Sequence, residues 1–251
     1  MVVVLAWIAA VLAADRVATP GQQLLLGILS WGLLALLLVA CSPLIRVQTL
    51  VVVAFATVVE YVFSGWLGVY VYRLDHVPAY VPPGHGLVYL AALSLGGLEL
   101  VRRHERLAVV VTSGVVVAYA AYGLSPWAPR PDVLGAFWAA CLLAFLWFGR
   151  SPRLFVGAFV VVTYLELMGT HWGVWTWGTH DPTGLVTIGN PPSGAAGGYG
   201  WFDLAAVLAA PALLVAWRSA VRAVPWRGEG GQDVVVQQPV GAHRIAPAQG
   251  T

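Results

Sequence analysis

The sequence contains no lysine, and only 10% of its 251 residues are charged. A soluble domain carries roughly 25% charged residues, so this composition excludes an ordinary soluble fold. Without lysine there is no phosphate-binding loop of the usual kind, and the Gly-x-Gly-x-x-Gly fingerprint of dinucleotide-binding proteins is absent as well. The net charge of +2 does not indicate nucleic-acid binding. We therefore expect no cofactor and no nucleic-acid partner.

Cysteine is also scarce. The chain has only Cys41 and Cys141, and both lie in apolar runs. Their separation matches no metal-ligand spacing, and we interpret them as buried thiols rather than as a disulfide. They predict no metal site.

Apolar residues, in contrast, make up 59% of the sequence and form long runs separated by short polar breaks. A membrane-spanning helix needs about 20 mostly apolar residues. We therefore predict an all-α polytopic membrane bundle with about eight spans. The expected spans are residues 2–14, 22–41, 47–72, 84–101, 107–124, 133–148, 154–170 and 199–216.

The arginines indicate the orientation of these spans. Nine of the thirteen follow even-numbered spans, and three, Arg16, Arg73 and Arg130, follow odd-numbered spans. Positive charge stays on the cytoplasmic side of a membrane. We therefore expect a multi-pass protein of the cell membrane with both termini in the cytoplasm and with the loops 73–83 and 171–198 facing outward.

The two halves of the chain share short segments in the same order, which predicts an internal duplication. The matching segments are Ser42-Pro43 with Ser151-Pro152, Glu60 and Gly68–Tyr72 with Glu166 and Gly173–Trp177, and Gly84–Ala92 with Gly198–Ala206. Each unit has an even number of spans, so the two copies have the same orientation. We predict four-helix repeats over residues 1–106 and 107–217, followed by a disordered cytoplasmic tail over 218–251.

Charged residues inside expected spans are costly and usually functional. At about 1.5 Å rise per residue, Glu60, Glu166, Asp203 and Tyr89 should reach one depth in the outer third of the membrane. His85 should lie one turn above Tyr89. We expect these residues to form the floor of a polar pocket that opens outward, with Glu60, Glu166, Asp203 and His85 as the catalytic candidates.

The expected walls of this pocket are aromatic and polar side chains of the outer segments. We assign substrate binding to Tyr70, Tyr72, Tyr89, His171, Trp175, Trp177, Asn190 and Trp201. Alternative interpretations remain open. The aromatic residues are also typical of an interfacial belt, and each glutamate is also compatible with a purely structural role. His85, His171, His180 and Asp181 match no known metal-ligand spacing, and we predict no metal there. Asp15 and Asp132 are expected at the surface.

Acid–base chemistry on an alkene fits these residues. A glutamate in a low-dielectric pocket favours its neutral form, and aromatic faces stabilise a developing carbocation. We therefore expect Glu60 to donate a proton and Glu166 or Asp203 to take one up or to activate water. We expect His85 to tune or relay protons.

The stretch from Glu60 to Tyr72, followed by Val77-Pro78 and Val81-Pro82, resembles a motif of the membrane-embedded carotenoid hydratase family. In that family a helix carries a glutamate that is followed by a Gly-x-Tyr-x-Tyr segment and a Val-Pro turn. The resemblance covers about 30 residues and recurs more faintly from Glu166 to Trp177. It implies a membrane enzyme that performs hydration, cyclisation or isomerisation of an isoprenoid or related lipid.

Two other functions remain open from the sequence. Paired buried carboxylates are also found in proton- or cation-coupled transporters, and a membrane assembly subunit would need no chemistry of its own. The expected partner is a membrane lipid or another lipophilic substrate. The sequence does not indicate an oligomeric state.

Overall fold

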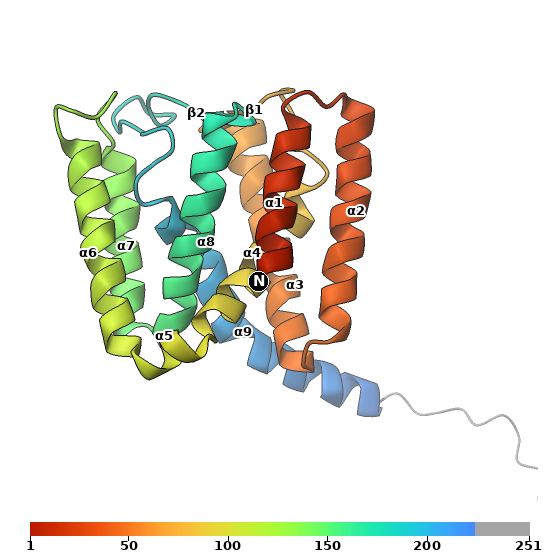
Figure 1. The fold of residues 1–251 in the computed structure, drawn as a ribbon. Coiled ribbons are helices and arrows are strands. Elements are labelled where there is room, and N and C mark those ends of the chain that lie inside the picture. Colours follow the sequence, from red (N-terminus) through yellow and green to blue (C-terminus); the bar gives the residue numbers. More distant parts are fainter. Residues whose placement is uncertain (224–251) are drawn as a thin grey trace, which may run out of the picture.

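The computed structural model describes residues 1–223, which form a bundle of roughly upright helices (Figure 1). The helices are, in chain order, α1 (Val2–Asp15), α2 (Pro20–Val39), α3 (Pro43–Glu60), the π-helix η1 (Tyr61–Trp66), α4 (Val81–Gly96), α5 (Glu99–Arg103), α6 (Glu105–Leu124), α7 (Val133–Phe148), α8 (Pro152–His171) and α9 (Ala195–Ala223). Two short strands, β1 (Tyr70–Tyr72) and β2 (Trp175–Trp177), pair with each other in antiparallel orientation.

Five helical segments are long and apolar enough to cross a membrane, so the chain is a membrane-embedded helical protein. These segments are Pro20–Val39, Pro43–Trp66, Glu105–Leu124, Pro152–His171 and Ala195–Val221. α1 and α7 are apolar but shorter, and α4 has only 16 residues. The expectation of eight spans thus remains a prediction for these three helices.

Prolines and side-chain caps explain where several helices begin. Thr19 forms a capping box with Gln22 at the start of α2, and Ser42 accepts a hydrogen bond from the Ile45 amide at the start of α3. Proline occupies the first turn of α2, α3, α4 and α8, where its missing N–H costs nothing.

Three expected boundaries were wrong. The third span, predicted over 47–72, ends at Trp66 because Gly68 takes a positive φ of 63° and the chain turns into β1. The fourth, predicted over 84–101, divides into α4 and the short α5. The last helix continues to Ala223, so residues 218–223 are helical rather than part of a disordered tail. Residues 224–251 of the expected tail lie outside the described part of the chain.

The connections alternate between the two ends of the bundle (Figure 1). β1, β2 and the α6–α7 connection lie at one end, which we call the strand end. α5 and the α2–α3 connection lie at the opposite end. Arg46 and Arg153 lie near the starts of α3 and α8, and Arg102 lies in α5, so these arginines belong to elements that begin or lie at the latter end.

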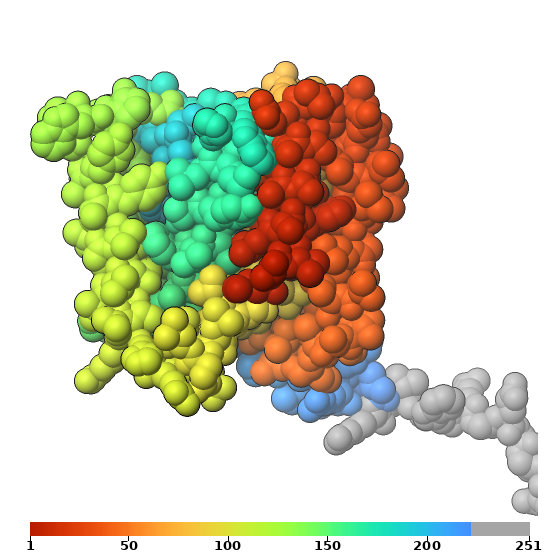
Figure 2. Space-filling view, in the orientation of Figure 1, coloured from red at the N-terminus to blue at the C-terminus, as the bar shows by residue number. Residues whose placement is uncertain are grey.

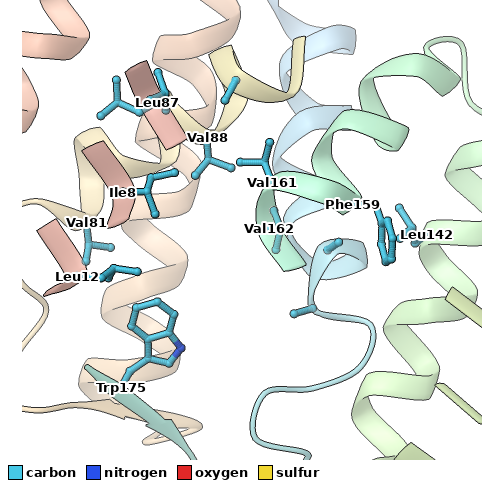
Figure 3. Packing of buried hydrophobic residues seen from close by; sticks show 14 of the residues in the cluster. Ile8, Leu12, Val81, Leu87, Val88, Leu142, Phe159, Val161, Val162 and Trp175 are labelled. Carbon is cyan, nitrogen blue, oxygen red and sulfur yellow. The ribbon is translucent and has the colours of Figure 1, made fainter. Parts of the chain in front are cut away.

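α4 is the central helix of the bundle, and most of its residues are buried. It packs on α8 so closely that a Cβ atom on Gly157 would lie 2.1 Å from the Ala92 carbonyl oxygen. Small residues let membrane helices approach in this way. Close to this contact, Val88 of α4 lies beside Val161 of α8 (Figure 3).

The other helices surround this pair. α3 packs on α9, while α6 and α7 flank α8 and α9 on one side of the bundle. α1 lies across the face shown in Figure 2, between α8 and the α2–α3 pair. The core thus brings helices from both halves of the chain into direct contact.

Candidate functional site

The β1–β2 ribbon places four aromatic side chains over the middle of the bundle. Its register pairs Tyr70 with Trp177 and Tyr72 with Trp175. Side chains of a strand alternate between its two faces. These four residues are therefore buried, whereas Val71 and Thr176 point outward. Because their rings are enclosed by protein, they do not form a lipid-facing interfacial belt.

Glu60, the last residue of α3, lies beneath β1 and is 5% exposed. Its Oε2 atom accepts hydrogen bonds from the hydroxyls of Tyr70 at 2.9 Å and Tyr72 at 2.8 Å. Its Oε1 atom lies 2.8 Å from Nε2 of His85 on α4. Burial raises the pKa of both phenols, and the nearby Glu60 charge raises it further, so both remain protonated hydrogen-bond donors.

Glu166 of α8 lies beneath β2 in a corresponding arrangement and is 3% exposed. Its Oε2 atom accepts hydrogen bonds from the indole Nε1 atoms of Trp175 and Trp177, both at 3.0 Å. The Tyr199 hydroxyl on α9 lies 3.4 Å from Oε1. Each predicted glutamate is therefore buried and accepts hydrogen bonds from the strand that follows it in the chain.

Both carboxyl groups line one cavity of about 350 Å³. His85 also lines it and is the only basic side chain among the described residues that do so. The rest of the wall is apolar and rich in aromatic rings from both halves of the chain. It includes Trp7, Phe55, Phe63, Tyr70, Tyr72, Tyr80, Trp138, Trp175, Trp177, Tyr199, Trp201 and Phe202.

The backbone around the ribbon is held by specific contacts. Gly173 precedes β2 with a φ of 66°, as Gly68 precedes β1, and such a positive φ favours glycine. Asn190 Oδ1 accepts a hydrogen bond from the Trp177 amide at 3.0 Å, and Arg130 Nη2 donates to the Trp177 carbonyl at 3.0 Å. These contacts fix the strand that carries the indoles.

Asp15, predicted at the surface, is completely buried and joins α1 to the chain around β1. Its carboxylate accepts hydrogen bonds from Gln23 at 2.6 Å and from the Tyr80 hydroxyl at 2.9 Å. Arg73, directly after β1, lies 3.5 Å from it. The position of Asp15 at a helix end suggested exposure, but long-range partners enclose it.

Asp132 is likewise buried, at 2% exposure, rather than at the surface. It caps α7 by accepting the Gly135 amide at 2.9 Å. It also accepts the amides of Gly189 at 2.7 Å and Ser193 at 2.6 Å. One carboxylate thus fixes the loop between β2 and α9 against the start of α7.

Asp203 and Tyr89 do not line the cavity, contrary to the expected common floor. Tyr89 is buried in a separate apolar cluster with Phe202, and its hydroxyl has no hydrogen-bond partner among the described residues. Asp203 is 5% exposed, beside that cluster. The residues directly before them, Val88 and Phe202, do line the cavity. Both side chains therefore lie at the depth of the cavity but on another side of their helices.

Of the other predicted site residues, some line the cavity and some do not. Trp201 lines the cavity and is 47% exposed. His171 is exposed at the end of α8, and neither it nor Asn190 lines the cavity, where both were expected to bind substrate. Within residues 1–223, no three His, Cys, Asp or Glu side chains come together as a metal site.

Sequence reasoning did not include Tyr199, Tyr80 and Trp138 among the site residues. The predicted duplication contained a signal for Tyr199, because Gly198–Gly200 matches Gly84–Gly86 and so aligns Tyr199 with His85. Tyr80 and Trp138 carry no comparable signal, because their place at the cavity depends on how distant helices pack.

Comparison with protein-family models, with curated proteins and with solved structures finds no match to this chain. The fold and the site define the class of protein directly. It is a membrane-embedded helical protein with two buried glutamates facing one aromatic cavity.

Proposed function

We propose that this protein is an integral membrane enzyme that performs acid–base chemistry on an isoprenoid or another alkene-containing lipid. One observation carries the proposal: Glu60 and Glu166 face the same apolar, aromatic cavity. A site of few convergent polar groups in an apolar pocket is typical of small-molecule sites.

The chemistry requires two protonation states in one enclosed space. Hydration, cyclisation and isomerisation of an alkene all begin when an acid adds a proton to a carbon atom, which leaves a carbocation. Two nearby carboxyl groups can act as the acid and the base of such a cycle, with His85 hydrogen-bonded to one of them. The rings of Tyr70 and Trp177, whose centroids are 4.5 Å apart, offer faces that stabilise positive charge.

The size and surroundings of the cavity favour a lipophilic substrate. A volume of about 350 Å³ lies at the lower end of the range for ligand pockets, so a long isoprenoid chain would place only one end inside. Two lining residues, Phe55 and Trp201, are 39% and 47% exposed on helices long enough to span the membrane. A substrate dissolved in the bilayer can reach the cavity past them. The resemblance of residues 60–72 to the carotenoid hydratase motif supports the same substrate class.

We also infer eight spans in two parallel repeats, with both termini in the cytoplasm. Equivalent contacts support the duplication. Glu60 meets the second and fourth residues after Gly68, and Glu166 meets the second and fourth residues after Gly173. The arginine distribution supports the orientation, in which the ribbon and the cavity lie on the outer side.

The proposal is tested by lipid and pigment profiling of the native host. A deletion strain is complemented with wild type, with Glu60→Gln, with Glu166→Gln or with Glu99→Gln. Glu99 is the matched control, because it is exposed and pairs with Arg102 and Arg103 on α5. We expect one isoprenoid species to accumulate in the deletion and to be cleared by wild type and Glu99→Gln only. An unchanged profile in every strain, at equal protein levels, would overturn the enzyme proposal.

A second candidate, a proton- or cation-coupled transporter, is favoured by one observation. Tyr89 and Asp203 offer buried polar groups beyond the cavity, further from the strand end. A carrier needs polar groups on both sides of its site. Substrate-dependent proton uptake into proteoliposomes, together with an unchanged lipid profile, would support this candidate. A non-catalytic assembly subunit would show neither signal.

A further inference from the structure

The two glutamates are not hydrogen-bonded equally, although they sit at corresponding places. Glu60 has three partners at 2.8–2.9 Å, and they occupy both of its oxygens. Tyr70 and Tyr72 donate to Oε2. A carboxylate oxygen can only accept, so His85 donates from Nε2 to Oε1 when Glu60 is ionised. This set of donors stabilises an anion at Glu60.

The hydrogen bonds to Glu166 are distributed unevenly over its two oxygens. Both short hydrogen bonds, from Trp175 and Trp177, reach the same oxygen, Oε2. An indole N–H is a donor only, so Oε2 must remain an acceptor and cannot itself carry a proton toward either ring. Oε1 has only the Tyr199 hydroxyl, at the longer distance of 3.4 Å.

Two carboxylates on one apolar cavity repel each other, and removing both charges from water is costly. The described lining contains a single basic side chain, His85, and it contacts Glu60. The least costly arrangement therefore keeps one proton on the pair of glutamates. That proton resides where the negative charge has the fewest donors, which is on Oε1 of Glu166.

We propose that Glu166 Oε1 is the atom that donates the proton, and that the Glu60–His85 pair is the base. Trp175 and Trp177 are then positioning residues, because they hold Oε2 as the acceptor oxygen and leave Oε1 as the acid. This reverses the roles expected from the sequence. It rests on the proposed function, since it divides the acid and base roles of that same site.

The alkene π electrons form a new C–H bond with the proton of Oε1, and Glu166 becomes a carboxylate. The carbocation then loses a proton from a neighbouring carbon to the Glu60–His85 pair, which restores an alkene after isomerisation or cyclisation. In a hydration, water adds to the cation and its surplus proton goes to the same pair. Return of that proton to Glu166 completes the cycle.

The experiment is infrared spectroscopy of the full chain in lipid nanodiscs, because it reads protonation without any need for turnover. A protonated carboxyl and a carboxylate absorb at different frequencies. We expect Glu166→Gln to remove a protonated-carboxyl band and Glu60→Gln to remove a carboxylate band. Loss of the protonated band in Glu60→Gln, with the band retained in Glu166→Gln, would overturn the proposal.

If the glutamine variants do not fold, a matched pair of milder variants tests the same assignment. Trp177→Phe keeps a ring but removes one N–H donor to the Glu166 carbonyl oxygen. The protonated-carboxyl band should therefore shift to higher frequency. Tyr72→Phe removes one donor to Glu60 and should leave that band unmoved. A shift in Tyr72→Phe alone would contradict the assignment.

Turnover of the lipid identified by profiling separates this inference from the proposed function. General acid catalysis is worth roughly 10²–10⁴-fold, so Glu166→Gln should lower turnover by about 10²-fold or more. If the infrared bands are as expected but no isoprenoid is converted, the enzyme proposal fails and the protonation assignment stands. If conversion occurs while the protonated band belongs to Glu60, only the role assignment fails.

Discussion

Tyr70 of β1 lies opposite Trp177 of β2, and each of the two donates a side-chain hydrogen bond to the buried glutamate of its own half of the chain. Their ring centroids are 4.5 Å apart. The ribbon therefore joins the surroundings of Glu60 and Glu166 through one aromatic contact. A displacement of the Tyr70 or Trp177 ring should therefore affect both carboxyl groups.

Gly169→Ala tests how tightly the ribbon is seated. A Cβ atom at residue 169 would lie 1.9 Å from the Trp175 ring, so the indole must move away from Glu166. We expect a loss of about 1–3 kcal/mol in stability, as for other overpacked cores, and reduced activity. Thermal unfolding in detergent and lipid turnover measure the two effects. Gly114→Ala, with nothing within 4 Å, should be neutral or slightly stabilising. Equal effects of the two substitutions would contradict this packing.

Asp132→Asn tests the anchor of the loop before α9. The amide side chain would present N–H groups where the carboxylate now accepts three backbone amides, so at least one buried donor loses its acceptor. We expect a loss of about 2 kcal/mol or more, seen as a lower unfolding temperature. Asp75→Asn, an exposed aspartate at the strand end, is the control. An unfolding temperature equal to that of the control would refute the role of Asp132.

Tyr80→Phe tests the corresponding anchor at Asp15. The substitution removes one of the two side-chain hydrogen bonds to a fully buried carboxylate, and bonds to charged groups contribute about 1.5–3 kcal/mol. We expect a loss within this range, measured by thermal unfolding. Tyr61→Phe, at a residue that is 57% exposed, should change stability by less than about 0.5 kcal/mol. The prediction fails if the two variants unfold together.

The loop around Asp181 should lose its hydrogen-bonded structure in acid. The Thr183 hydroxyl, followed by the Val186 amide, holds the pKa of the Asp181 carboxyl below its ordinary value of 3.8. Because the folded-state pKa is the lower one, the stabilisation is present above the ordinary value and is lost as the pH falls through the folded value. Hydrogen exchange at Leu185 and Val186, corrected for the intrinsic rate, should show protection falling below about pH 4. In Asp181→Asn the protection should not depend on pH in this range. Persistent pH dependence in that variant would assign the effect to another group.

Much of the site could be predicted from the sequence because burial of charge is rare in apolar runs. Glu60 and Glu166 stand out in such runs, and the matching Gly-x-aromatic-x-aromatic segments predict which rings accompany them. Both predictions agree with the cavity lining. Depth counting failed for Asp203 and Tyr89, because depth along a helix does not specify which side of the helix faces a cavity.

The sequence by itself determined that this is a helical membrane protein. It also determined that its unusual feature is a pair of glutamates in apolar runs, each followed by a segment with alternating aromatic residues. These properties depend on composition and on local spacing, which the order of residues fixes directly. Only the tertiary structure decided that β1 and β2 pair, that both glutamates share one cavity, and that Asp15 and Asp132 are buried anchors. Those relationships join residues far apart in the chain, and they arise from the packing of α4 on α8 and α3 on α9, which no local pattern encodes.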